Sequence, residues 1–83
     1  MKDEINGAIA AWEDSEIGDP LVLIHGLSES RAAWQHQSQE LSKHFRVISY
    51  DVRGFGESEI GVAEGTPQQF ARDLAGLLSN LGV

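Results

Sequence analysis

The sequence lacks cysteine altogether and has only two prolines and six basic residues among its 83 positions. Without cysteine, disulfides, thiolate nucleophiles and thiolate-bound metals or clusters are excluded. Thirteen acidic residues against six basic ones give a net charge of −7. This charge, with no basic stripe to oppose it, argues against binding to nucleic acid.

The sequence also lacks any long hydrophobic run. Its longest unbroken run of Leu, Ile and Val is Leu21–Ile24, far below the ~20 apolar residues that span a bilayer. Residues 2–4 are charged, so no secretory signal is predicted. A hydrophobic content of 41% suits a globular chain, and the length allows one small domain with a thin core. We therefore expect a soluble cytoplasmic protein with no membrane partner.

The dipeptide Asn6-Gly7 predicts a β-hairpin, because a type I′ turn needs positive φ at both of its central residues. Its arms are expected at residues 2–5 and 8–13. The first arm is short and charged, as edge strands often are.

Two further strands are predicted. Residues 21–24 are apolar on both faces, which is typical of a strand in a parallel sheet that is covered on both sides. Residues 46–50 form the second of these strands. A loop at 25–28 follows the first strand, and a glycine-rich loop follows the second and leads into a structureless stretch through Gly61 and Gly65.

A helix is predicted over residues 31–43. Ser30 precedes it as a candidate N-cap, because a serine hydroxyl accepts a hydrogen bond from an N–H of the first turn. Three apolar residues spaced by seven and four positions fall on one stripe of this helix, namely Trp34, Leu41 and Phe45.

A second helix is predicted over residues 67–81. Thr66 is expected to be its N-cap, with proline at the first helical position and Gln69 completing a capping box. Its apolar stripe consists of Phe70, Leu74, Leu77, Leu78 and Leu81. Gly82 suits the left-handed residue with which many helices end.

The order hairpin, strand, helix, strand, helix predicts an α/β fold with right-handed βαβ units and parallel strands. One motif follows each strand of the βαβ unit. These motifs are His25-Gly26 and Asp51-x-Arg53-Gly54-x-Gly56-x-Ser58. Together with the Asn-Gly hairpin they resemble the α/β-hydrolase family, in its esterase, enol-lactonase and haloperoxidase-like branch. The resemblance covers nearly the whole chain and implies the amino-terminal part of the hydrolase sheet.

This resemblance implies a hydrolase that cleaves small carboxylic esters or lactones with a Ser-His-Asp triad and without a cofactor or metal. One oxyanion-hole N–H would come from Leu27, the residue after Gly26, and a second from the residue after the nucleophile. A main-chain donor does not depend on its own side chain, so leucine is compatible with the role. Gly26 is expected to matter because a side chain there would crowd the substrate carbonyl.

The sequence departs from the family in lacking the Gly-x-Ser-x-Gly elbow that carries the nucleophile. Two near matches end in Ser30 and Ile60 where glycine is needed, and their central serines, Ser28 and Ser58, are the weaker alternatives. Because the triad residues start at the elbow in family order, we expect nucleophile, acid and base to lie beyond this chain. Residues 1–83 are then expected to be the amino-terminal portion of a single hydrolase domain, inactive alone, with the remainder of that domain as its partner.

Several polar motif residues are expected to hold the loops in place. His25 is expected to be pinned under its loop by hydrogen bonds, and a role as general base is the alternative. Asp51 is expected to accept N–H bonds from the loop that contains Gly54 and Gly56. The Ser58 hydroxyl is expected to tie that loop down.

Two further loop residues, Arg53 and Phe55, each have two possible positions. Arg53 either bridges the loop or faces the rim of the active site, and Phe55 either lines a pocket or packs on the domain. His36 and His44 are expected to be exposed, because two helical turns separate them and a shared metal ion would need further ligands. A solvated charged loop is indicated by Glu57, Glu59 and Glu64.

Two functions from other classes remain open. A nucleotide-binding βαβ module would have Asp51 in a suitable place, but its Gly-x-Gly-x-x-Gly turn is missing and Gly26 stands alone in the first turn. A non-catalytic interaction module would keep the hydrolase fold and bind a partner through an exposed sheet edge.

Overall fold

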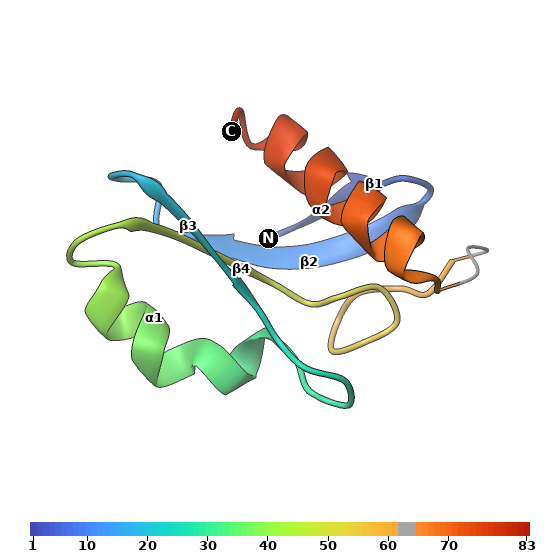
Figure 1. The fold of residues 1–83 in the computed structure, drawn as a ribbon, viewed down its shortest axis with the longest axis horizontal. Helices are drawn as coiled ribbons and strands as arrows, with labels where there is room; N and C mark the ends of the chain where they lie inside the picture. The colour runs from blue at the N-terminus through green and yellow to red at the C-terminus, as the bar shows by residue number, and fades with distance from the viewer. Residues whose placement is uncertain (62–64) are drawn as a thin grey trace.

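The computed structural model describes residues 1–61 and 65–83 (Figure 1). Within these residues there are four strands and two α-helices, and one 3₁₀ turn precedes the first helix. In chain order the elements are β1 (Lys2–Ile5), β2 (Ala8–Asp14), β3 (Pro20–Ile24), η1 (Arg31–Trp34), α1 (Gln35–Leu41), β4 (Arg46–Tyr50) and α2 (Pro67–Asn80). Glu64, which was predicted to belong to a charged loop, lies outside the described residues.

The hairpin at the start of the chain is confirmed. Asn6 has φ 51° and Gly7 has φ 83°, so both central residues have the positive φ that a type I′ turn requires. The arms pair antiparallel, with Ile5 opposite Ala8. β2 runs one residue longer than expected, to Asp14.

The four strands form one sheet in the order β1-β2-β4-β3. β4 is parallel to β3, with Leu21 opposite Val47, and antiparallel to β2, with Trp12 opposite Tyr50. The predicted α/β fold with a parallel βαβ unit is therefore confirmed. Among the described residues β3 pairs with β4 only, so its other edge is free of strand partners, and Ile24 is 49% exposed.

Helix α2 covers one face of the sheet. Leu77 packs against three buried aromatic and aliphatic residues of β2 and β4, namely Trp12, Ile48 and Tyr50. At the start of the helix the Thr66 hydroxyl accepts a hydrogen bond from the Gln69 N–H at 3.1 Å. A capping box also needs the Gln69 side chain to bond back to the main-chain N–H of Thr66. This part of the prediction is wrong, because the Gln69 side chain donates to Asp73 at 2.9 Å instead.

The other face carries η1 and α1, on the side of the sheet opposite α2 (Figure 1). The single helix predicted over residues 31–43 is wrong: a 3₁₀ turn runs from Arg31 to Trp34 and the α-helix ends at Leu41. Trp34 interrupts the helix with φ −98° and ψ 8°. Neither η1 nor α1 has a buried residue, because the sequence of α1 is almost entirely polar.

Two residues assigned to that helix lie beyond its end. Phe45 does not continue the apolar stripe and is 39% exposed. His44 belongs to the turn before β4, so the two exposed histidines, His36 and His44, do not share a helix. Ser30 does act as the predicted cap, since its hydroxyl accepts a hydrogen bond from the Ala32 N–H at 3.3 Å.

The segment after β4 contains no helix or strand at Ser58 and Glu59, as predicted. Both residues nevertheless lie along β2 through hydrogen bonds to its main chain. The Ser58 hydroxyl accepts from the Ala11 N–H at 2.9 Å, and the Glu59 N–H donates to the Ile9 carbonyl at 2.8 Å. The Glu59 carboxylate also accepts from the Ile9 N–H at 3.1 Å, so this glutamate is exposed but not free of partners.

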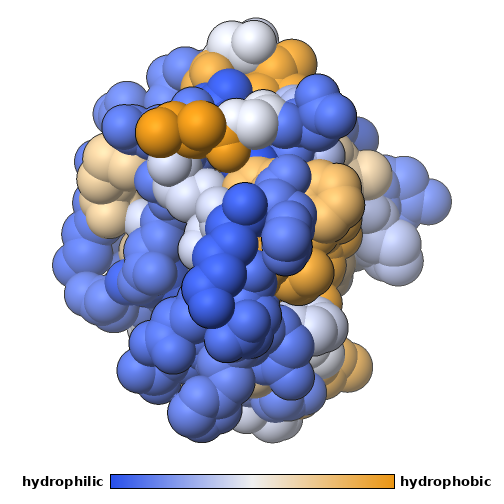
Figure 2. Space-filling view, turned by 90° about the vertical axis from the view of Figure 1, so that its left-hand side faces the viewer, coloured by the Kyte–Doolittle hydropathy of each residue, from blue (hydrophilic) through white to orange (hydrophobic). Residues whose placement is uncertain are grey.

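The surface is largely hydrophilic but retains hydrophobic residues. Figure 2 faces the left-hand side of Figure 1 and shows hydrophilic residues over most of its centre and lower part, with hydrophobic ones at the top and along the right. Two of the exposed large hydrophobic residues, Ile24 and Leu27, follow one another closely at the end of β3. In the part of the chain that the structure describes, no helix is long and apolar enough to cross a bilayer.

Candidate active site at the carboxyl ends of β3 and β4

An apolar cavity of about 370 Å³ lies where β3 and β4 end. In open α/β sheets this is the edge at which ligands bind. Burial raises the pKa of the Tyr50 phenol, so this group stays protonated at neutral pH. Phe55 lines the cavity, which agrees with the alternative that it lines a pocket. The lining consists of Ile24, His25, Gly26, Leu27, Tyr50, Val52, Phe55, Phe70, Ala71 and Leu74.

His25 joins the ends of the two strands. Its Nε2 accepts a hydrogen bond from the Val52 N–H at 2.9 Å, so its Nδ1 carries the proton and donates to the Gly26 carbonyl at 2.7 Å. The ring is 7% exposed and meets Phe55 edge to face, with centroids 5.8 Å apart. Both ring nitrogens are occupied by main-chain groups, an arrangement that pins the side chain and leaves neither nitrogen free to act as a base.

Gly26 and Leu27 form the rim of the cavity. The Leu27 side chain is 79% exposed, and the Leu27 N–H donates no hydrogen bond to any residue that the structure describes. A Cβ on Gly26 would lie 2.8 Å from Oε1 of Glu29, the flexible end of a side chain. This part of the loop therefore offers an unpaired main-chain donor next to a residue with no side chain.

The two serines weighed as nucleophiles have different surroundings. Ser28 has φ 65°, a left-handed conformation that is uncommon for serine, and its hydroxyl has no hydrogen-bond partner among the described residues. A serine nucleophile needs a base within hydrogen-bond reach. The Ser58 hydroxyl is buried and donates to the Asp51 carbonyl at 2.6 Å. Neither serine is bonded to a histidine.

Asp51 lies at the end of β4, beneath the loop that follows β3. Asp51 is 1% exposed, and its carboxylate accepts hydrogen bonds from the Arg31 N–H at 2.7 Å and the Glu57 N–H at 2.8 Å. The Arg31 guanidinium forms an ion pair with the same carboxylate. A Cβ on Gly56, whose φ is +53°, would collide with it. The glycine at 56 is therefore required by both conformation and space.

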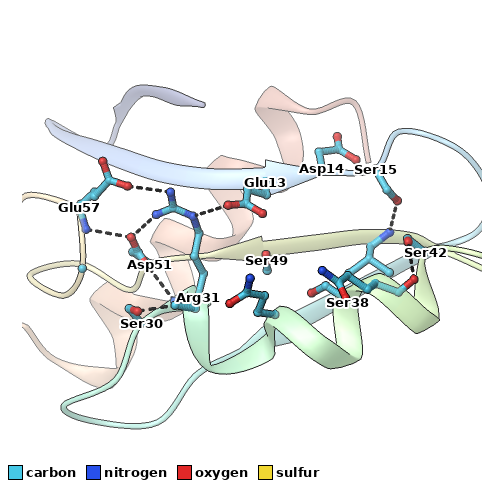
Figure 3. Close-up of a pocket in the computed structure, with 15 residues that line it drawn as sticks. Glu13, Asp14, Ser15, Ser30, Arg31, Ser38, Ser42, Ser49, Asp51 and Glu57 are labelled. Atoms are coloured by element: carbon cyan, nitrogen blue, oxygen red, sulfur yellow. Dashed lines mark hydrogen bonds and ion pairs between the residues drawn. The ribbon is translucent and has the colours of Figure 1, made fainter.

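Arg31 lies at the centre of an acidic cluster (Figure 3). Besides Asp51, its guanidinium donates to Glu57 at 2.8 Å and to Glu13 at 3.2 Å. Burial would lower the pKa of Arg31, but these hydrogen bonds and the Asp51 charge raise it above its usual value. Glu57 also pairs with Lys2 at 3.1 Å, and it is exposed in a loop, as predicted for this charged segment. The cluster borders a cavity of about 630 Å³ between α1 and the sheet, most of whose lining residues are polar.

Arg53 bridges the loop rather than facing the cavity. Its guanidinium donates to Asp73 of α2 at 2.7 and 2.8 Å, to the Ile60 carbonyl at 2.9 Å and to the Asn6 carbonyl at 3.1 Å. These hydrogen bonds to Asp73 raise the pKa of Arg53, although burial opposes the change. Arg53 thus connects the hairpin turn, the glycine-rich loop and α2. Gly54 turns this loop with φ +82°.

A comparison of the sequence with known families agrees with this geometry. Residues 19–83 match the sequence profile of the alpha/beta hydrolase fold. The chain belongs to the α/β-hydrolase family. The resemblance inferred from the two motifs is therefore confirmed, and the family does not support the alternative of a nucleotide-binding module.

Relatives of this α/β-hydrolase chain include enzymes with several substrates. A soluble epoxide hydrolase from Corynebacterium sp. is 36% identical over 94% of this chain and 27% of its own length. The structure of a thermophilic esterase from Thermogutta terrifontis is 39% identical with a TM-score of 0.92, over 99% of this chain and 32% of that one. The enol-lactonase from Burkholderia xenovorans LB400 is 31% identical with a TM-score of 0.92, over 100% of this chain and 34% of that one. The chain therefore spans about a quarter to a third of these proteins.

Two charged partners, Arg31 and Asp73, were not identified from the sequence. Arg31 was assigned only to a helix, and Asp73 was not singled out. One signal for Asp73 was available, since it is an acidic residue beside the apolar stripe of α2 and four positions before the buried Leu77. In residues 1–61 and 65–83 no three His, Asp or Glu side chains are grouped so that they could hold a metal ion.

Proposed function

We propose that the protein containing these residues hydrolyses small carboxylic esters or lactones, and that residues 26–27 supply half of its oxyanion hole. One observation carries the proposal. The Leu27 N–H is an unpaired main-chain donor on the rim of an apolar cavity, at the carboxyl end of a parallel strand, in a chain of the α/β-hydrolase family.

The chemistry follows from the charge that develops during acyl transfer. Attack on an ester carbonyl converts its oxygen into an oxyanion, and an N–H held in place before the reaction stabilises that charge most strongly in an apolar surrounding. The Leu27 N–H would be one donor. The second N–H, and the Ser-His-Asp triad, would come from residues outside these 83.

The topology supports an amino-terminal place for residues 1–83 in a single hydrolase domain. α1 and α2 lie on opposite faces of the sheet, and β4 already has a partner on each side. A right-handed crossover that leaves β4 through α2 and enters another parallel strand passes over β3 to its free edge. A strand there would bring its own carboxyl end, and the elbow that follows it, next to Gly26 and Leu27.

The test is an activity assay of the protein expressed from its complete coding sequence. We expect turnover of p-nitrophenyl acetate and of a simple lactone, and covalent labelling by a fluorophosphonate that reacts with activated serines. Failure of both turnover and labelling would contradict the proposal.

A second candidate is epoxide hydrolysis. It is favoured by the soluble epoxide hydrolase from Corynebacterium sp., whose match extends over 94% of this chain. Adding styrene oxide to the same assay separates the two candidates. Turnover of the epoxide without turnover of ester or lactone would support the second candidate and overturn the first.

A further inference from the structure

The loop between β3 and η1, residues 25–30, is held at its two ends by Asp51 and Val52, two consecutive residues that follow β4. We propose that Asp51 is a positioning residue for this loop, and that it acts together with the main chain of Val52. The inference rests on the proposed function, because the loop carries the Leu27 N–H that was assigned to the oxyanion hole.

The first end of the loop is fixed by Val52. The Val52 N–H donates to Nε2 of His25 at 2.9 Å, and Nδ1 of His25 bonds to the carbonyl of Gly26 at 2.7 Å. The imidazole therefore orients the Gly26 carbonyl and, through the shared peptide unit, the N–H of Leu27.

The second end is fixed by Asp51. Its carboxylate accepts from the main-chain N–H of Arg31 at 2.7 Å and pairs with the guanidinium of the same residue. The Glu57 N–H supplies a third donor at 2.8 Å. The Asp51 side chain is fully buried, and a buried carboxylate with three donors has a single favourable position. Arg31, and with it the end of the loop, is located by that position.

The conformation between the two anchors shows that they are needed. Ser28 has φ 65°, which an L-residue other than glycine rarely adopts, and such a conformation persists only where the surrounding structure enforces it. Within the loop the only main-chain hydrogen bond among described residues runs from the Glu29 N–H to the Gly26 carbonyl at 3.2 Å. The strained loop therefore depends on contacts at its ends.

Displacement of an oxyanion donor lowers the rate of the chemical step more than it lowers substrate binding. A misplacement of about 1 Å can cost about 100-fold in rate. Asp51 touches neither the cavity that Leu27 lines nor a substrate in it, so its effect would be indirect and would fall on kcat.

The experiment compares Asp51→Asn with Asp14→Asn. Asp14 is a matched control, because its side chain is 3% exposed and pairs with Arg46 through hydrogen bonds of 2.7 and 3.0 Å, at the opposite end of the sheet. Both variants lose one buried carboxylate beside an arginine, but only Asp51→Asn places an amide NH₂ against the donors that hold loop 25–30.

With p-nitrophenyl acetate and the complete protein, we expect Asp51→Asn to lower kcat by about 10- to 100-fold while KM changes by less than about threefold. Asp14→Asn is expected to keep kcat within about twofold. Arg31→Lys keeps the main-chain bond and a positive charge, so it should lower kcat by more than the roughly twofold limit set for Asp14→Asn and by less than about 100-fold. It remains a test if Asp51→Asn does not fold.

Amide hydrogen exchange of the complete protein, followed at residues 1–83, gives a readout that does not depend on activity. Exchange at Arg31 and Glu29 should accelerate in Asp51→Asn relative to Asp14→Asn, while exchange at Ile48 should be equally affected by both. Equal kcat in the two Asn variants, or equal exchange at Arg31, would overturn the inference. An inactive wild-type protein would instead contradict the proposed function, and the exchange data would still decide whether Asp51 holds the loop.

Discussion

Arg53 and Asp73 lie twenty positions apart in the chain and meet through two hydrogen bonds of 2.7 and 2.8 Å. The Arg53 side chain is 4% exposed and that of Asp73 is 12% exposed. This pair is the polar connection between the glycine-rich loop and α2, and it lies away from the cavity at the ends of β3 and β4.

Asp73→Ala should destabilise the fold by about 3 kcal/mol, because it leaves a buried guanidinium without its carboxylate. Urea unfolding followed by tryptophan fluorescence would measure the loss, since Trp12 is buried in the core beneath α2. Glu40→Ala is the control: Glu40 pairs with Lys43 at 3.3 Å on the exposed surface of α1, where such a pair contributes little. Equal losses in the two variants would contradict the importance of the buried pair.

Stability should fall in acid. Burial raises the pKa of Asp73, but hydrogen bonds from Arg53, Gln69 and Asn6 outweigh it and hold the pKa below its ordinary value of 3.8. The hydrogen bond from Arg46 likewise lowers the pKa of Asp14, against burial.

A carboxylate whose pKa is depressed by folding contributes stability that is present above its unfolded pKa and is lost as the pH falls through the folded one. The free energy of unfolding should therefore decrease steadily below about pH 4. Denaturation of wild type and Asp73→Asn at about pH 3 and about pH 6 checks this, because the variant should lose less stability between the two. An equal loss would show that Asp73 does not contribute to the acid transition.

Gly56→Ala should be more destabilising than Gly7→Ala. Both glycines have positive φ, +53° and +83°, so each substitution carries the backbone strain of about 1–2 kcal/mol. The Cβ at position 7 would meet nothing within 4 Å, whereas the Cβ at position 56 would collide with the Asp51 carboxylate. Thermal melting of the two variants isolates the steric part, and similar melting temperatures would mean that the carboxylate moves aside at little cost.

The elements that the sequence predicts well are those whose signals are local. The Asn6-Gly7 turn depends on two φ values, and α2 was predicted to within one residue because its caps and apolar stripe lie inside the helix. The helix at 31–43 was mispredicted because three apolar residues gave a period but no buried face.

The contacts of the site depend on distant parts of the chain. Arg31 meets Asp51 because the parallel register of β3 and β4 brings their carboxyl ends together. From the sequence, the motif residues indicate where the loops begin, but not which side chain holds which loop. These pairings follow from the register of the strands and from the side of the sheet on which each helix packs.

In the complete protein, Leu27→Ala should keep kcat, whereas Gly26→Val should lose about 100- to 1000-fold if a donor is displaced. In the proposed oxyanion hole the donor at position 27 is main chain, and a side chain at 26 would intrude where a substrate carbonyl approaches. The fold should tolerate the change at 26, because Gly26 does not have positive φ and its nearest described contact is the end of the Glu29 side chain. Ester hydrolysis and thermal melting together test this, and near-normal kcat in Gly26→Val with a loss in Leu27→Ala would refute the oxyanion assignment.

The 83-residue chain in isolation should self-associate through the free edge of β3. Within residues 1–61 and 65–83 that edge has no strand partner, and Ile24 beside it is 49% exposed. Ile24→Lys should suppress association in sedimentation velocity at low micromolar concentration, because a charge on an edge strand opposes pairing. Ile17→Lys is the control, since Ile17 is 81% exposed in the loop before β3. A monomeric wild-type chain with amides at 21–24 strongly protected from exchange would show that the edge is closed in another way.

The central position of β4 has a consequence for the order in which the chain can fold during synthesis. β2 and β3 both pair with β4, yet β4 is the last of the four strands to be made. A hairpin forms in about 1–10 μs, whereas a ribosome adds about 5–20 residues per second. For on the order of seconds the β1–β2 hairpin is therefore without β4, the strand that pairs with β2 in the complete sheet. Because an isolated hairpin is marginal in water, we expect the nascent chain to stay a substrate for chaperones until Arg46–Tyr50 emerge and the strands join around them.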